Sequence, residues 1–190
     1  MHKIPVYQPW INGKEREYVN DCIDSSWISS KGEYISRFES AFSVAVGVKY
    51  SETVSNGTVA LHLCMLALGI GPGDEVLVPT LTYIASVNAI KYVGATPVFV
   101  DADPITWQIS PSDLELKITE KTKAVIVVHL YGHPSDMTPI TETCKRKGIY
   151  LVEDCAEALG TYYKGAHVGG FGDMSSFRAW YQQMPDNLIH

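Results

Sequence analysis

The sequence predicts an α/β domain in which helices cover both faces of a mostly parallel sheet. Apolar residues at helical spacing alternate along the chain with short apolar runs that suit strands. Most of the predicted helices are followed by a glycine, which is the usual helix terminator. The run Ala124–Val128 is apolar throughout, as expected for a central parallel strand that is buried on both faces.

The N-terminal half supplies the first predicted elements. An apolar stripe at helical spacing (Val19, Cys22 and Ile23) indicates a first helix. A second stripe, which ends at Gly47, indicates another. The predicted elements that follow are a strand at 48–54, a helix at 59–68, a strand at 75–78, a helix at 84–93 and a strand at 96–100.

The C-terminal half continues the same alternation. Ser110, Pro111 and Asp113 form a helix start, because serine caps, proline suits the first helical position and an acid suits the third. The strand Ala124–Val128 follows, then a helix near Ile140–Lys147. Gly148 leads into a last predicted strand, 149–152.

Composition excludes several classes of protein. The chain has 190 residues, of which 46% are hydrophobic, so it is not intrinsically disordered. A net charge of −6 argues against a nucleic-acid-binding surface. No apolar run reaches the roughly 18 residues of a membrane span, and no secretory leader is expected. Four cysteines without a CxxC pair favour reduced thiols in the cytoplasm and no metal site.

The segments that follow the strands carry the candidate chemistry, because ligands of parallel sheets bind beyond the carboxyl ends of the strands. Gly57 and Thr58 open a helix and suit a phosphate, although a plain helix cap explains them as well. Tyr83 is either a platform for a planar cofactor or a core residue. Asp154 either pairs with a protonated ring nitrogen or caps a following helix, one turn before Glu157.

Other patterns predict less. A carboxylate at the end of the apolar strand, as in Glu153-Asp154, needs a cation or several donors. His129 and His133 have a metal-like spacing, but Gly132 and Pro134 place them across a loop, so no metal is expected. No glycine-rich dinucleotide fingerprint follows a strand, which disfavours a Rossmann-type oxidoreductase. A phosphate seat, an aromatic platform and a strand-end aspartate together suit pyridoxal 5'-phosphate (PLP).

Taken together, the segments resemble the sugar-nucleotide aminotransferases of the DegT/DnrJ/EryC1/StrS family, from about Ile4 to Phe177. The landmarks are, in order, WISSKG at 27–32, VSNGTVALHL at 54–63, VPTLTYIASVN at 78–88, VHLYGHP at 128–134 and VEDCAEA at 152–158. The resemblance implies a partial large domain of a fold-type I PLP enzyme over residues 1–177 and a divergent tail over 178–190.

The resemblance also implies the chemistry. An amino group would pass from glutamate to a keto-sugar nucleotide, GDP-4-keto-6-deoxymannose in the closest branch, for O-antigen synthesis. By the same resemblance the cofactor-binding residues are Gly57, Thr58, Tyr83, Asp154 and Glu157. Trp27, Ser29 and Lys31 would lie near the sugar nucleotide. The family's active sites form at a homodimer interface.

The chain departs from the family after Phe177. The family's phosphate-binding serine would fall at Arg178 and its Schiff-base lysine at Gln183. An amide nitrogen is not a nucleophile, so we expect no transaminase activity and at best non-covalent PLP binding. A frameshift, an insertion or a disrupted gene would explain the change, and an unfinished sheet predicts poor solubility. The alternatives are a PLP-binding remnant, an interaction fragment, or an enzyme of the family that acts on another nucleotide sugar.

Overall fold

The computed structural model describes residues 11, 13–30 and 32–178, which fall into two compact units divided after Thr53. The first unit contains helices α1 (Glu15–Asp24) and α2 (Glu33–Val46). Gly47 ends α2 in the left-handed conformation (φ +78°), as the sequence predicts. Helix α1 forms where the apolar stripe predicts it, but it buries none of its residues.

The second unit, Val54–Arg178, is built on a five-stranded parallel sheet of order β2-β1-β3-β4-β7. Its strands are β1 (Glu75–Pro79), β2 (Thr96–Val100), β3 (Thr122–Val128), β4 (Tyr150–Asp154) and β7 (Met174–Ser176). The apolar strand β3 lies at the centre, and its pairing with β4 aligns Val128 with Asp154 at the carboxyl edge. A separate hairpin joins β5 (Tyr162–Tyr163) to β6 (Ala166–His167).

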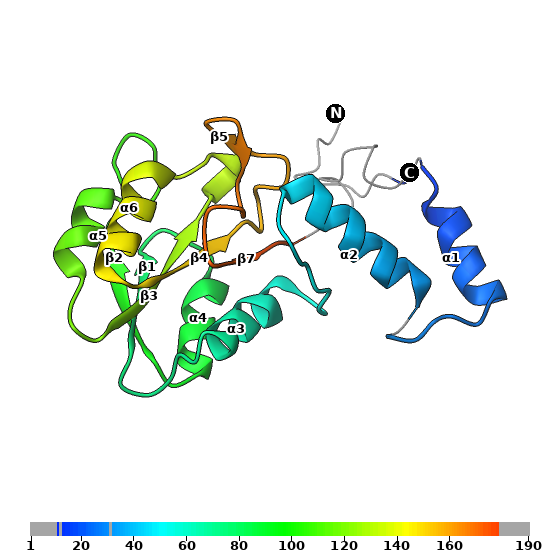
Figure 1. Cartoon of the computed structure of the whole chain (residues 1–190), viewed down its shortest axis with the longest axis horizontal. Helices are drawn as coiled ribbons and strands as arrows, with labels where there is room; N and C mark the ends of the chain where they lie inside the picture. The colour runs from blue at the N-terminus through cyan, green and yellow to red at the C-terminus, as the bar shows by residue number, and fades with distance from the viewer. Residues whose placement is uncertain (1–10, 12, 31, 179–190) are drawn as a thin grey trace, which may run out of the picture. The chain divides into compact units, whose positions relative to one another are not determined.

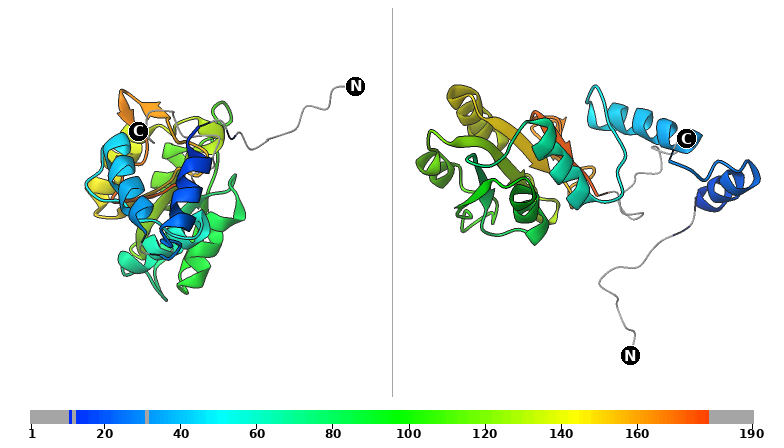
Figure 2. Two further views of the ribbon diagram at one scale, coloured as in Figure 1. Left: turned by 90° about the vertical axis from the view of Figure 1, so that its right-hand side faces the viewer. Right: turned by 90° about the horizontal axis from the view of Figure 1, so that it is seen from below.

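Helices cover both faces of this sheet, which gives the expected three layers (Figure 1). Helices α3 (Gly57–Ala67) and α4 (Ile84–Tyr92) lie on one face, and α5 (Pro111–Lys117) and α6 (Met137–Lys147) lie on the other (Figures 1 and 2). Alternate residues of β3 divide between the two cores: Ala124 and Ile126 pack on the α3 side, and Val125 and Val127 pack on the α6 side.

One sequence prediction about local structure is wrong, and one of the two alternatives for Asp154 is excluded. Residues 48–54 form no strand; they run irregularly and are held to α2 by side-chain hydrogen bonds, such as the one from the Thr53 amide to Glu39 Oε1 (2.8 Å). Asp154 caps no helix, because residues 155–160 form turns in the structure. Glu157 therefore lies in a turn, and a short 3-10 helix, η1 (Leu130–Gly132), lies beside it.

Among the described residues, no helix combines the length and the apolar composition that a membrane span requires.

Candidate functional site

The carboxyl edge of the sheet brings together segments that are distant in sequence. The His129 amide after β3 donates to the carbonyl of Asp154 at the end of β4 (3.1 Å). The Tyr131 amide donates to Glu157 Oε2 (2.7 Å). Ser86 in the first turn of α4 donates its hydroxyl to Asp154 Oδ2 (2.7 Å). The segments after β3 and β4 are thus in direct contact, and α4, which follows the segment after β1, joins them through Ser86.

Asp154 is the buried acid of this edge, with only 5% of its surface exposed. Its Oδ2 accepts from Ser86, and its Oδ1 accepts from the Ala156 amide (3.2 Å). Burial raises the pKa of Asp154, and these two hydrogen bonds oppose that rise. A carboxylate accepts about four hydrogen bonds, so these two donors leave lone pairs for a cationic ligand.

The start of α3 forms the second part of the site. Asn56 caps the helix, and its Oδ1 accepts from the Val59 amide (3.0 Å). Gly57 and Thr58 are the first residues of the helix, where free amides and the helix dipole favour an anion. The Gly57 carbonyl accepts from Ser176 Oγ at the end of β7 (3.3 Å). A methyl group at Gly57 would lie 3.7 Å from Cβ of Arg178, so position 178 adjoins the predicted phosphate seat.

Tyr83 lies directly before α4, three residues before Ser86. Its side chain is 72% exposed, which excludes the alternative that it is a core residue. An exposed ring at a strand-end loop remains free to pack against a ligand.

Glu157 holds the loop after β3 in an uncommon conformation. Tyr131 has φ +56° and ψ +27°, a left-handed conformation that is rare for residues other than glycine. Its amide donates to Glu157 Oε2 at 2.7 Å. Strained backbone of this kind is concentrated at functional sites. Within the described part of the chain, Glu157 therefore contacts backbone at the edge where the sequence places the cofactor.

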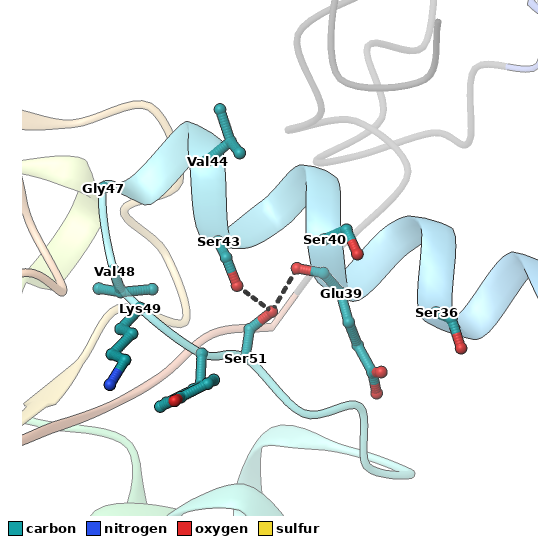
Figure 3. Close-up of a pocket in the computed structure, with 10 residues that line it drawn as sticks. Ser36, Glu39, Ser40, Ser43, Val44, Gly47, Val48, Lys49 and Ser51 are labelled. Carbon is teal, nitrogen blue, oxygen red and sulfur yellow. Dashed lines mark hydrogen bonds between the residues drawn. The ribbon is translucent and has the colours of Figure 1, made fainter.

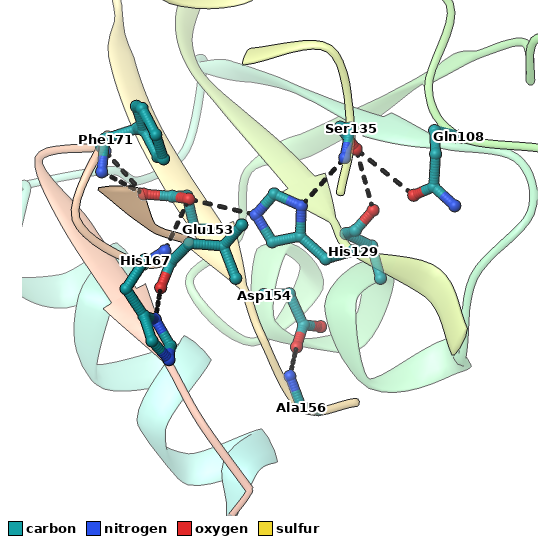
Figure 4. A network of polar contacts seen from close by, with 12 residues as sticks. Gln108, His129, Ser135, Glu153, Asp154, Ala156, His167 and Phe171 are labelled. Carbon is teal, nitrogen blue, oxygen red and sulfur yellow. Dashed lines mark hydrogen bonds and ion pairs between the residues drawn. The ribbon is translucent and has the colours of Figure 1, made fainter. Parts of the chain in front are cut away.

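Glu153 lies beside Asp154 on the opposite face of β4 and is fully buried. Its carboxylate accepts from His129 Nε2 (3.0 Å) and from the amides of Gly169 (2.8 Å), Phe171 (2.8 Å) and Gly172 (2.7 Å) (Figure 4). Burial alone would raise the pKa of Glu153, but the hydrogen bonds from His129 and from the amides outweigh it, and the pKa is lowered. The prediction that a carboxylate here needs several donors is confirmed.

His129 is a link in this network. Its Nδ1 accepts from the Ser135 amide (3.1 Å), so in the neutral ring the proton is on Nε2, which donates to Glu153. Ligand atoms of His129, Glu153 and Cys155 all lie within 4.8 Å of one another. Both ring nitrogens and both carboxylate oxygens already have hydrogen-bond partners, which favours a structural network over a metal site. His133 is exposed and apart from this cluster.

The residues predicted to lie near a sugar nucleotide belong to the first unit. Trp27 is 56% exposed, and Ser29 is exposed as well, in the segment that connects α1 to α2. Lys31 and Gln183 lie outside the described residues. The roles of Trp27, Ser29 and Lys31 stay predictions.

A hollow lies between α2 and the segment that follows it (Figure 3). Within it, Ser51 Oγ donates to the Glu39 carbonyl (2.6 Å), and Ser43 Oγ donates to Ser51 Oγ (3.0 Å). These contacts pin the segment after α2 to the helix. The polar groups are used in holding the chain, so the hollow has a structural explanation.

Sequence reasoning missed Ser86 and the acceptor role of Glu153 toward the loop at 169–172. Ser86 lies in the predicted helix 84–93, but no local signal identifies it as the partner of Asp154. No sequence signal identifies the glycine-rich loop as the partner of Glu153, since that pairing depends on the return of the chain to form β7.

The chain is similar to a known family of proteins and to several of its members. The model of the DegT/DnrJ/EryC1/StrS aminotransferase family matches residues 9–179. The chain is 66% identical over 177 residues to a GDP-perosamine synthase from Escherichia coli O157:H7 and 56% identical over 174 residues to one from Vibrio cholerae. The alignments cover 93% and 92% of this chain but 49% and 47% of those proteins, so the chain spans about half the length of these relatives.

A solved structure shares the fold. A protein from Streptococcus pneumoniae, whose name proposes a sugar aminotransferase, was solved in its PLP form. It superposes with a TM-score of 0.89 at 36% identity, over 93% of this chain and 48% of that one. At this identity the likeness supports common descent as well as a common fold.

Proposed function

Because this chain belongs to the DegT/DnrJ/EryC1/StrS aminotransferase family, we propose that its second unit is built to hold PLP for amino transfer from glutamate to a keto-sugar nucleotide. The names of the two relatives above support GDP-perosamine as the product of the complete reaction. The acceptor is then GDP-4-keto-6-deoxymannose, for O-antigen or other polysaccharide synthesis in the cytoplasm. Another nucleotide sugar is the alternative acceptor.

The observation that carries this proposal is the buried carboxylate of Asp154 at the carboxyl edge of the sheet. Burying a carboxylate is unfavourable unless a cation or enough donors compensate it. Ser86 and Ala156 each give one hydrogen bond. A protonated pyridine nitrogen would complete the set, so the residues present fit the cofactor.

PLP supplies an electron sink, because its protonated ring accepts the electron pair released when the substrate Cα proton leaves. In the proposal, Asp154 keeps the ring nitrogen protonated and fixes its direction. Tyr83 packs against the ring, and the amides of Gly57 and Thr58 bind the phosphate. Glu157 lies beside the cofactor and braces the loop at Tyr131.

For the chain of 190 residues we propose PLP binding without catalysis. Gln183 stands where the family has its Schiff-base lysine, and an amide nitrogen is not a nucleophile. We therefore propose reversible, non-covalent binding of PLP without turnover. An association with a second copy is part of the proposal as well, since the family's sites form between subunits.

The test is a binding titration of PLP, with Asp154→Asn as the variant and Asp24→Asn as the control on an exposed helix of the other unit. A hydrogen bond to a charged group contributes about 1.5–3 kcal/mol, so Asp154→Asn should weaken binding about 10- to 100-fold. The control should bind as the parent does. Equal affinities for parent and Asp154→Asn would refute the proposal, and turnover with glutamate would refute its inactive part.

A further inference from the structure

The hydroxyl groups of Thr82 and Ser86 are linked to the carboxylate of Asp154 by consecutive hydrogen bonds. Ser86 is fully buried, and its Oγ lies 2.7 Å from Asp154 Oδ2. Thr82 Oγ1 lies 3.2 Å from the same Ser86 oxygen. An ionised carboxylate only accepts, so the single hydroxyl proton of Ser86 points to Asp154. Ser86 Oγ then accepts the second bond from Thr82, whose hydroxyl lies closer to Ser86 than to its other acceptor, the Tyr83 carbonyl (3.4 Å). The chain of hydrogen bonds runs from Thr82 through Ser86 to Asp154.

The place of Ser86 in the fold makes this contact rigid. It lies in the first turn of α4, where its own amide donates to the Tyr83 carbonyl (3.3 Å). Side chains at the start of a helix lie near the positive end of the helix dipole, which favours the ionised form of a nearby carboxylate. Donor and acceptor come from residues 68 positions apart, on α4 and β4, so the bond depends on the packed fold.

Several other groups face Asp154 and act in different directions. On its own segment, Glu157 and Cys155 follow it, and Glu157 raises its pKa. From the segment after β3, His129 acts to lower that pKa. From α3, the Cys64 thiol faces Asp154. Its pKa is raised to about 11, mainly by burial and to a smaller extent by the nearby charge of Asp154. In contrast to these groups, Ser86 donates a side-chain hydrogen bond to the carboxylate of Asp154.

We infer that Ser86 is a positioning residue for the PLP site: with Thr82 behind it, it fixes the carboxylate of Asp154 in one orientation and holds it ionised for a cationic pyridine ring. The inference deepens the proposed function and rests on it. Oδ2 is occupied by the hydroxyl and Oδ1 by the Ala156 amide, which restricts the rotation of the carboxylate. The remaining lone pairs then have fixed directions.

The test follows the titration of Asp154 itself in the cofactor-free chain. Infrared difference spectra record the carboxyl band, and Asp154→Asn assigns it by its loss. A hydrogen bond to a charged group corresponds to about one to two pKa units, so Ser86→Ala should raise the pKa of Asp154 by about that amount. Ser86→Thr retains the hydroxyl and should restore the parent titration.

Ser135→Ala is the matched control, because Ser135 is also fully buried and its hydroxyl contacts the Val128 carbonyl (3.2 Å) and Gln108. It should leave the titration of Asp154 unchanged. Ser86→Cys, which keeps the side-chain size with a weaker donor, replaces Ser86→Ala if that variant does not fold, and should shift the pKa in the same direction.

The same variants are then titrated with PLP. A raised pKa of Asp154 together with several-fold weaker PLP binding supports the inference. An unchanged carboxyl titration in Ser86→Ala and Ser86→Cys overturns it, even when PLP binds the parent. A parent chain that binds no PLP, with the pKa shift still present, refutes the proposed function and thereby the role of Ser86 in it, while the hydrogen bond itself stands.

Discussion

Replacing Glu153 by glutamine tests the buried network most sharply, because it changes charge and hydrogen bonding with little change in volume. Oε2 accepts from His129 and Gly169, and Oε1 accepts from Phe171 and Gly172. In glutamine one of these oxygens becomes an NH2 donor. Whichever way the amide is turned, two donors then face a third donor: two buried ones at Oε2, or two partly buried ones at Oε1.

The expected loss of stability follows from the two donors that are left without an acceptor. A buried donor left without an acceptor costs about 1–3 kcal/mol, so two give roughly 2–6 kcal/mol. His129 cannot compensate by moving its proton to Nδ1, because that nitrogen accepts from the Ser135 amide. We expect Glu153→Gln to lower the free energy of unfolding by that amount, as measured by urea denaturation.

The pH dependence gives an independent check. The pKa of Glu153 is lowered in the folded state from the model-compound value of 4.5. Its stabilisation is therefore present above pH 4.5 and is lost as the pH falls through the lower, folded-state value. The gap between parent and Glu153→Gln should narrow in acid.

Glu115→Gln is the control for the same chemical change at the surface. Glu115 is half exposed and pairs with Arg146 (2.6 Å), so its loss should change stability by about 0–1 kcal/mol. If the unfolding free energy of Glu153→Gln lies within about 1 kcal/mol of the parent value at neutral pH, the hydrogen bonds to Glu153 do not stabilise the fold as we infer.

Three further predictions concern stability. Because burial raises the folded-state pKa of Asp154, its ionisation destabilises the cofactor-free fold as the pH rises above 3.8. Asp154→Asn should therefore melt at or above the melting temperature of the parent at neutral pH. A lower melting temperature would contradict this. Gly169→Ala should be destabilised more than Gly165→Ala in thermal melts, since both have positive φ but only at Gly169 would the added methyl overlap the Phe177 ring; equal losses would show that the ring moves aside. Asn56→Ala should reduce the free energy of unfolding by about 1 kcal/mol through loss of the α3 cap, and an unchanged denaturant midpoint would contradict it.

The sequence predicted most of the second unit because its signals are local. The apolar run of β3, the cap at Ser110 and the glycines after the helices each act within a few residues. The prediction of a strand at 48–54 is wrong for the same reason. Its residues suit a strand, but Ser51 and Thr53 hydrogen-bond to α2, and no neighbouring strand pairs with them in the described structure.

The candidate site was predicted in its residue types but not in its connections. The cost of burying Asp154 is visible in sequence, since an acid ends an apolar strand. The donor that meets it, Ser86, lies 68 residues away, and only the packing of α4 against the sheet brings the two together. The same holds for Glu153, whose amide partners lie 16–19 residues further along.

An amide NMR map of the chain titrated with PLP would show residue by residue where the cofactor binds. We expect the largest shifts at the carboxyl edge of the sheet, on Gly57, Thr58, Tyr83 and the turn after Asp154, and no shifts at the C-terminal end of α6, which packs on the other face. Shifts spread over exposed lysines, with none at that edge, would contradict it.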